Sequence, residues 1–308
     1  MYFPYLRGKQ FELLALKELV VSNKLSNKVI PVIEPLKPSS TLINTLKAFD
    51  NEELQVAVIP NPSVGSFQLE YQKDDKEGFR EQYEVLLNQP SVLLAINLDN
   101  FDNLNIELVE DYPNKLVSVC LNADSIPLHV KFIGEKAKFN LIKDGKEFSR
   151  EISHNKVMLE DKFNSQKRNA DYCRIPDELF SSDHIFYKTE GYLGFSDYSV
   201  VGSDYTEGGF APYAIAIHIV YFDENKKLRI KHFTSDSNDD YDDPAGKFQE
   251  AISKLANCSE LEKVQTDGLN ELRECYQSKR YPGLGSVKKM AIKHHLELMS
   301  TFLIEEDH

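Results

Sequence analysis

The sequence opens with Tyr2-Phe3-Pro4-Tyr5-Leu6, an apolar run that leads into Arg7-Gly8-Lys9. Two similar runs follow within the first sixty residues, at 29–33 and 56–59, and the intervening residues 10–20 show the spacing of an amphipathic helix. Short runs that are apolar throughout are typical of parallel strands covered on both faces. This order predicts alternating strands and helices, with polar residues where each strand ends.

Five further strand candidates continue the pattern, and the candidates are spaced by about 20 to 35 residues, as a (β/α)8 barrel requires. They cover residues 92–96, 116–121, 138–142, 157–159 and 199–201. A different pattern begins near residue 211, where an antiparallel hairpin over 214–221 and 228–233 precedes helices over 245–255 and 287–304. We therefore expect a distorted TIM-like α/β barrel over residues 1–210. A hairpin and helices over 211–308 would pack on it without forming an independent domain.

Composition restricts the class of protein. Hydrophobic residues make up 41% and charged residues 28% of the 308 residues, as in ordinary globular proteins. No apolar run approaches the roughly 20 residues that span a bilayer, and no secretion signal is evident. The net charge of −13 opposes binding to membranes and to extended duplex nucleic acid. The four cysteines are far apart, which indicates free thiols, and we expect a cytoplasmic protein.

Several short segments resemble the Beta-protein family of poorly characterised bacterial and phage proteins. The resemblance is carried by the opening residues 2–9 and by 33–35, 195–198, His218 and 294–296, and a bacterial subgroup shares 243–248 and 282–285. Membership would imply a barrel-like fold and a context of mobile elements or phage defence. It supplies no established reaction, so the chemistry must be argued from the residues.

Polar side chains follow most of the predicted strands. In a barrel the carboxyl ends of the strands meet at one mouth, where active sites lie. Carboxylates there suit acid–base work or metal binding, and cations suit an anionic group. The predicted catalytic residues are Glu34, Asp99, Asp161 and His218, and the predicted substrate-binding residues are Arg7, Lys9, Asn61, Asn97, Lys162 and Asp197.

Glu34 is the strongest single candidate, because it follows an apolar strand and precedes Pro35, which restricts its backbone. It would serve either in catalysis or as a structural ion pair with Arg7 or Lys9. The catalytic interpretation predicts that Glu34→Gln abolishes activity and leaves the melting temperature nearly unchanged.

Histidines give a weaker signal. His294 and His295 are adjacent on a predicted helix, so their side chains diverge by about 100° and cannot share one face. His218 and His232 lie on the two strands of the hairpin, and either could meet the doublet in space. No metal-binding motif is present, although the carboxylates leave Mg²⁺ or Mn²⁺ open as a cofactor.

Two functions follow from these observations. The first is a hydrolase or phosphodiesterase-like enzyme that acts on a phosphate-bearing small molecule or a nucleic-acid end. The second is a non-catalytic protein of anti-phage defence that binds a protein partner through the hairpin and the C-terminal helix, with Lys288, Lys289 and Lys293 at the contact. The recurrence of polar residues at strand ends favours the enzyme.

Overall fold

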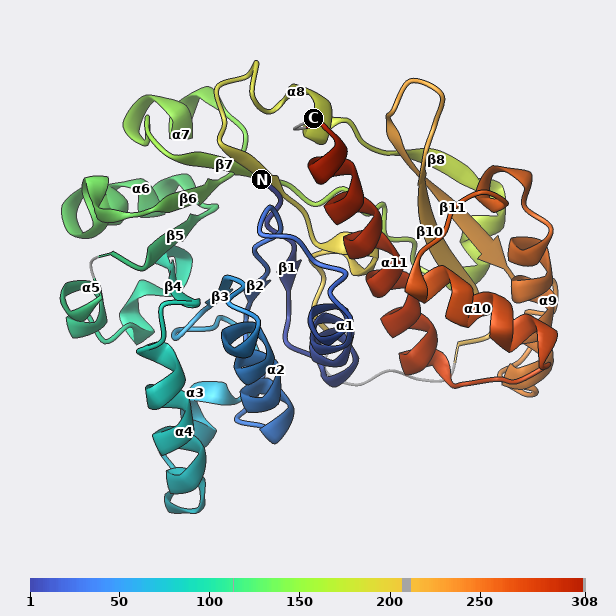
Figure 1. Cartoon of the computed structure of the whole chain (residues 1–308), viewed down its shortest axis with the longest axis horizontal. Coiled ribbons are helices and arrows are strands. Elements are labelled where there is room, and N and C mark those ends of the chain that lie inside the picture. Colours follow the sequence, from blue (N-terminus) through green and yellow to red (C-terminus); the bar gives the residue numbers. More distant parts are fainter. Residues whose placement is uncertain (113, 207–211, 307–308) are drawn as a thin grey trace.

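The computed structural model describes residues 1–112, 114–206 and 212–306. Its central feature is a sheet of eight parallel strands in sequential order, which confirms the predicted barrel (Figure 1). The strands are β1 (Tyr5–Leu6), β2 (Val32–Ile33), β3 (Val56–Val58), β4 (Val92–Asn97), β5 (Leu116–Cys120), β6 (Phe139–Ile142), β7 (Lys156–Leu159) and β9 (Gly194–Ser196).

Backbone hydrogen bonds between the last strand and the N-terminus bring the sheet close to a closed barrel. The amide of Phe3 donates to the carbonyl of Phe195 over 2.9 Å, and the amide of Tyr5 donates to the carbonyl of Asp197 over 2.8 Å. Alternate residues of the first segment face opposite sides, as strand geometry requires. Phe3 and Tyr5 join the core inside the barrel, whereas Tyr2 and Leu6 join the core beneath the helices.

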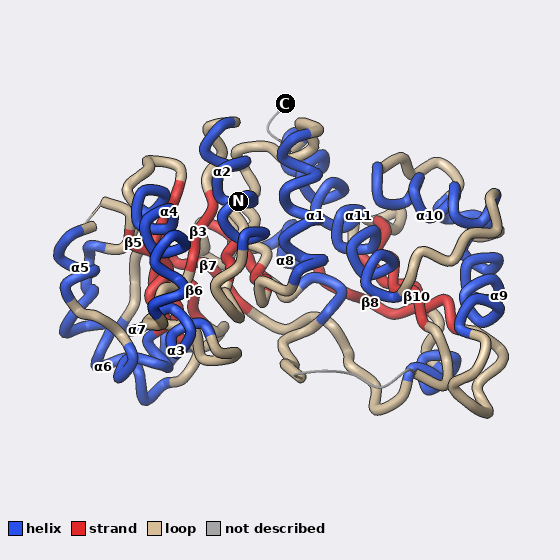
Figure 2. The backbone as a smooth tube through the Cα atoms, turned by 90° about the horizontal axis from the view of Figure 1, so that it is seen from below, coloured by secondary structure: helices blue, strands red, loops and turns tan. Residues whose placement is uncertain are grey.

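Helices cover the outside of this sheet (Figure 2). They are α1 (Gln10–Val21), α2 (Ser40–Asn51), α3 (Phe67–Tyr71), α4 (Glu77–Leu87), α5 (Glu107–Asp111), α6 (Ile126–Leu128), α7 (Lys146–Glu151) and α8 (Asp183–Phe186). The predicted apolar face of α1, with Leu13, Leu16 and Val20, is buried. The helices after the middle strands are only a few residues long, which distorts the barrel.

The predicted eighth strand at residues 199–201 is wrong in position. The strand that closes the barrel, β9, lies five residues earlier, and residues 199–201 form a short 3₁₀ turn. Ser199 has a φ of 52°, which is incompatible with a strand. The apolar pair Val200-Val201 resembles a strand in sequence, but its burial comes from packing at the barrel mouth.

The C-terminal region contains the predicted hairpin and helices. β10 (Ala216–Phe222) pairs antiparallel with β11 (Leu228–Thr234), and β11 also pairs with β8 (Asp177–Ser181), which leaves the barrel between β7 and β9. The helices are α9 (Pro244–Ala256), α10 (Asp267–Gln277) and α11 (Leu284–Glu305). Asp243 caps α9, since its carboxylate accepts a hydrogen bond from the amide of Gly246 over 2.9 Å. The small sheet thus combines strands from both sides of residue 211.

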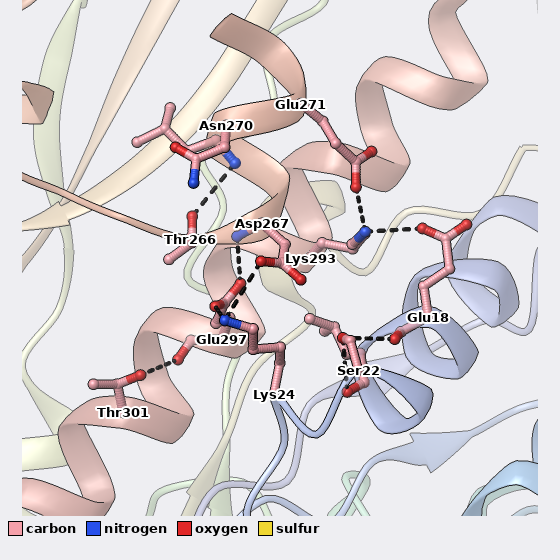
Figure 3. A network of polar contacts seen from close by, with 12 residues as sticks. Glu18, Ser22, Lys24, Thr266, Asp267, Asn270, Glu271, Lys293, Glu297 and Thr301 are labelled. Atoms are coloured by element: carbon pink, nitrogen blue, oxygen red, sulfur yellow. Dashed lines mark hydrogen bonds and ion pairs between the residues drawn. The ribbon is translucent and has the colours of Figure 1, made fainter. Parts of the chain in front are cut away.

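A network of charged residues joins the two regions where α11 packs against α1 and α10 (Figure 3). The buried ammonium group of Lys293 lies 2.9 Å from Glu18 of α1 and also pairs with Glu271 of α10. Nearby, Lys24 lies 3.2 Å from Glu297 of α11. These ion pairs fix α11 in the groove between the barrel and the small sheet.

Replacing Lys293 with methionine is expected to lower the free energy of unfolding by about 2 kcal/mol, because Glu271 and Glu18 lose a buried partner. Urea denaturation at pH 7 measures this change. Lys279→Met is the matched control, since Lys279 is exposed. An equal effect of the two substitutions would contradict a structural role for the network.

Across the described ranges, no helix combines the length and the apolar character that crossing a membrane requires.

Candidate functional site

The predicted mouth residues gather around an ion pair between Glu34 and Arg7. Glu34 is fully buried and accepts hydrogen bonds from the hydroxyl of Tyr5 over 2.8 Å and from the amide of Ser63 over 2.7 Å. Arg7 donates to the same carboxylate and to the carbonyl of Ser203, the latter over 2.8 Å. Burial of the guanidinium opposes its charge, but the neighbouring Glu34 raises the pKa of Arg7 above its ordinary value.

The backbone that follows Arg7 makes a sharp turn that depends on a glycine. Gly8, directly after Arg7, has a φ of 64°, and a Cβ atom there would lie 3.0 Å from the carbonyl oxygen of Glu34. Glycine therefore allows the chain to turn sharply at the end of β1 and to pass close to the end of β2. The Arg7-Gly8 sequence places the guanidinium over the mouth.

Charged side chains of the barrel mouth surround Tyr198. The sequence alone did not identify this residue as part of the site. The guanidinium of Arg7 lies 5.5 Å from the ring centre of Tyr5 and 5.7 Å from that of Tyr198. Burial raises the pKa of Tyr198 to about 12; Arg7 opposes this shift, and Glu34, Asp161 and Asp99 add to it. The structure thus brings these three predicted carboxylates near one phenol.

The carboxylates themselves are held by the backbone. Asp99 accepts hydrogen bonds from the amides of Leu121 and Asn122, over 3.1 and 3.2 Å. Asp161 accepts from the amides of Phe163 and Ser203, over 3.0 and 2.7 Å. These bonds order the loops at the strand ends.

The predicted binding residues Asn61, Asn97 and Lys162 also have protein partners. Asn61 donates to the carbonyl of Asn97 over 2.7 Å, and the side chain of Asn97 donates to the hydroxyl of Ser63 over 2.7 Å. Lys162 pairs with Glu160 and Asp183 at 2.6 and 2.8 Å. These three side chains stabilise loops around the mouth.

Asp197 is buried at the end of β9. One oxygen of its carboxyl accepts hydrogen bonds from the hydroxyl of Tyr2 over 2.8 Å and from the amide of Ser199 over 2.7 Å. Burial nevertheless raises the pKa of Asp197 to about 7, since these hydrogen bonds only partly offset the loss of solvent. The group thus titrates near neutral pH.

His218 lies outside this cluster, on the small sheet. Its Nδ1 atom is 2.7 Å from Nδ1 of His232, directly opposite on β11. Nε2 of His232 in turn lies 3.1 Å from the carboxylate of Glu178 on β8. Each strand of the small sheet therefore contributes one residue to a Glu178–His232–His218 relay.

The hydrogen bonds of this relay define the protonation of both rings. If Nε2–H of His232 donates to Glu178, its Nδ1 is free to accept a hydrogen bond from Nδ1–H of His218. Nε2 of His218 is then unprotonated, because the ring's one hydrogen lies on Nδ1. Burial and the neighbouring His232 lower the pKa of His218 well below its ordinary value, so the ring is neutral at pH 7.

A cavity of about 480 Å³ adjoins His218. Phe163, which follows β7, and Val200, which follows β9, form its barrel side, and Lys288 with the first residues of α11 forms the opposite side. Desolvation and the nearby charge of Lys9 lower the pKa of Lys288, while Glu12 opposes this shift. Lys288 and the N-terminus of α11 are therefore the positive groups of this cavity, and the carboxylate of Glu12 near Lys288 opposes them in part.

The adjacent residues His294 and His295 are buried and form hydrogen bonds within the protein core. His294 donates from Nε2 to the carbonyl of Val220 over 2.7 Å and accepts at Nδ1 from the hydroxyl of Thr266, also over 2.7 Å. His295 contacts the hydroxyl of Ser199 over 2.9 Å through Nδ1. The two rings diverge as predicted, and His218 meets His232 instead of the doublet.

The basic residues assigned to a partner surface are not equally accessible. Lys289 pairs with Glu18 at 2.5 Å, and Lys293 is buried in the network of Figure 3. Lys288 is exposed and faces the cavity.

In the described part of the chain, no group of three or more histidine, cysteine, aspartate or glutamate side chains is placed to hold a metal ion.

The fold and the site define an α/β barrel protein with an appended sheet. No family model and no curated protein matches the chain. Among solved structures, the chain is similar to the crystal structure of Streptococcus suis SuiB bound to S-adenosylmethionine, with 12% identity and a TM-score of 0.32. The match covers 64% of this chain and 46% of that protein, so the chain spans less than half of its length. Such a low TM-score carries no argument about function.

Proposed function

We propose that the chain is a hydrolase that acts on a phosphate-bearing substrate, with His218 as the acid–base group. The observation that supports this most is the Glu178–His232–His218 relay at the edge of a cavity that also presents Lys288. Glu178 orients His232, and His232 in turn orients His218, so that an unprotonated nitrogen of His218 lies beside the cavity. Lys288 and the N-terminus of α11, which both line the cavity, support a phosphate-bearing substrate.

The reaction follows from these positions. A water molecule attacks the phosphorus while Nε2 of His218 takes up one of its protons. The bond from phosphorus to the leaving oxygen breaks, and His218 returns the proton to that oxygen. Lys288 and the amides at the start of α11 stabilise the phosphoryl oxygens. The proposal needs only water and the substrate.

The mouth cluster has a different role in this proposal. Glu34 and Arg7 order Ser203 and Ser63, and Asp161 orders Ser203 and Phe163, so these residues position the loops beside the cavity. They are positioning residues, and the reacting atoms lie at His218. The resemblance to the Beta-protein family and the defence context stay predictions.

His218→Gln is expected to reduce kcat at least about 100-fold, because glutamine cannot exchange protons at neutral pH. The assay measures release of nitrophenolate from p-nitrophenyl phosphate and from bis(p-nitrophenyl) phosphate, and cleavage of an end-labelled oligonucleotide. Lys288→Gln should chiefly raise KM, and Lys279→Gln should change neither constant. Thermal melts of each variant show whether the fold is retained.

Undiminished turnover by a folded His218→Gln protein would refute the catalytic role. Absence of turnover on all three substrates by the unmodified protein would favour the non-catalytic recognition protein. In that case the hairpin strands β10 and β11 and the exposed Lys288 would be the first positions to test for partner binding.

A further inference from the structure

A second cavity, of about 690 Å³, lies beside α3, α4 and α5. Its volume falls within the range of small-molecule sites. It shares no lining residue with the cavity beside His218. Nothing in the proposed hydrolysis uses this cavity.

Aromatic rings form much of its wall. Phe67, Tyr71 and Tyr83 pack together, with ring centres 5.6 Å apart for Phe67 and Tyr71, 5.7 Å for Phe67 and Tyr83, and 5.9 Å for Tyr71 and Tyr83. Tyr112 adds a fourth ring. The faces of such rings carry negative partial charge and attract cations.

The charged residues that line the cavity are all acidic. They are Glu84 and Asp111, both exposed to solvent, and neither lysine nor arginine is among the lining residues that the structure describes. Arg80 is nearby, but its guanidinium donates to the backbone carbonyls of Tyr71 and Lys73, over 2.6 Å in both cases. The cavity therefore disfavours the phosphate group that the first cavity favours.

Tyr83 supplies a polar group without a partner. The side chain is buried, with 2% of its surface exposed, and within the described residues its hydroxyl makes no hydrogen bond. The hydroxyls of Tyr71 and Tyr112, by contrast, donate to Glu84 and Asn88, each over 3.2 Å. Because this hydroxyl is enclosed by the protein, Tyr83 contributes its ring to the cavity wall, and the charged groups open to a ligand are those of Glu84 and Asp111.

We infer that this cavity binds a small organic cation, namely an ammonium group attached to a flat or apolar ring. The ring would pack against Phe67 and Tyr71, and the ammonium group would lie among the aromatic faces. Glu84 and Asp111 would supply the opposite charge at the rim. This inference does not depend on the proposed hydrolase activity.

The test is calorimetric titration of the full chain with benzylammonium, with benzyl alcohol as the neutral analogue and benzoate as the anionic one. We expect benzylammonium to bind at least about tenfold more tightly than benzyl alcohol, and benzoate not to bind. Glu84→Gln combined with Asp111→Asn should weaken benzylammonium binding at least about threefold and reduce its salt dependence. Glu224→Gln combined with Asp239→Asn is the matched control, since both carboxylates are exposed and line neither cavity.

Equal affinity for benzylammonium and benzyl alcohol would overturn the inference, because the cavity would then select only an apolar ring. Unchanged benzylammonium binding in a folded protein that carries both Glu84→Gln and Asp111→Asn would overturn it as well. The hydrolase assays of His218→Gln are independent of both results, so either proposal can fail alone.

Discussion

Glu34→Gln is expected to lower the free energy of unfolding by about 3–5 kcal/mol, because it breaks a buried ion pair from one side. Glu34 is fully buried, and the side chain of its partner Arg7 is only 16% exposed. Glutamine keeps one acceptor oxygen but presents an amino group where the carboxylate receives hydrogen bonds from Tyr5, Arg7 and Ser63. The guanidinium would remain in the barrel mouth without a counter-charge.

Urea denaturation at pH 7 measures this loss, and a double-mutant cycle with Arg7→Met isolates the contribution of the pair. We expect the double variant to be more stable than the sum of the two single effects predicts. Asp99→Asn is the matched control, because Asp99 is exposed and its carboxylate accepts hydrogen bonds from two backbone amides. A melting temperature that Glu34→Gln leaves unchanged, as the catalytic interpretation of the sequence predicted, would refute the structural role.

Acidification from pH 7 to pH 5 is expected to destabilise the fold strongly, because buried histidines must stay neutral. Burial, together with neighbouring positive groups, lowers the pKa of His294 to about 4 and that of His295 to about 3. In the unfolded chain both titrate near 6.5, so only the unfolded state takes up protons in this interval. Their contribution to stability is therefore present above pH 6.5 and is lost as the pH falls, by about 2 kcal/mol per histidine at pH 5.

The geometry explains why His294 resists protonation. Its Nδ1 accepts a hydrogen bond from Thr266, and its Nε2 already donates to Val220. Protonation of Nδ1 would place a hydrogen where the Thr266 hydroxyl now directs its own hydrogen, so this hydrogen bond would be lost. Burial also lowers the pKa of His129, His184 and His232, which adds to the loss in acid.

Asp197 acts in the opposite direction. Its pKa is raised to about 7 in the folded state, against about 3.9 when unfolded, so the folded state binds the extra proton between these values. Protonation of Asp197 therefore stabilises the folded state in acid, and this stabilisation is lost as the pH rises through 7. Between pH 7 and pH 5 it offsets about 2 kcal/mol of the destabilisation by the histidines. Asp197→Asn should therefore make the acid loss steeper, and His295→Gln should make it shallower.

Urea midpoints of the three proteins at half-unit steps from pH 5 to pH 8 test these signs. The two variants are controls for each other, because both affect groups that contact Ser199. Asp197→Asn removes a titrating group at the end of β9, and His295→Gln removes one on α11. Parallel curves for all three proteins would show that neither group titrates between the folded and unfolded states as expected.

The sequence predicted most barrel strands because each is a short apolar run that needs no partner to be recognised. It misplaced β9, since Gly194–Ser196 has only one large apolar residue, whereas Val200-Val201 has the composition of a strand. It also missed β8, whose residues Asp177–Ser181 are mostly polar and pair with a strand fifty residues later. Pairing with β11 gives this segment its structure, and local composition does not show it.

The candidate site likewise contains residues whose position follows from the sequence and one residue whose position does not. Arg7, Glu34, Asp99 and Asp161 follow strands, so the barrel topology alone brings them to one mouth. His218 and His232 could have been paired from the hairpin register, since both lie at matching distances from the turn. Glu178 could not, because its position depends on β8 crossing from the barrel to the small sheet.

The sequence by itself determined the alternation of strands and helices, the hairpin and the residues that end each barrel strand. Their physical basis is local: side-chain periodicity, apolar runs and turn residues act within a few positions. Only the tertiary structure decided which polar groups form hydrogen bonds within the protein and which face open cavities. That distinction depends on burial and on partners distant in sequence, and it moves the proposed chemistry from Glu34 to His218.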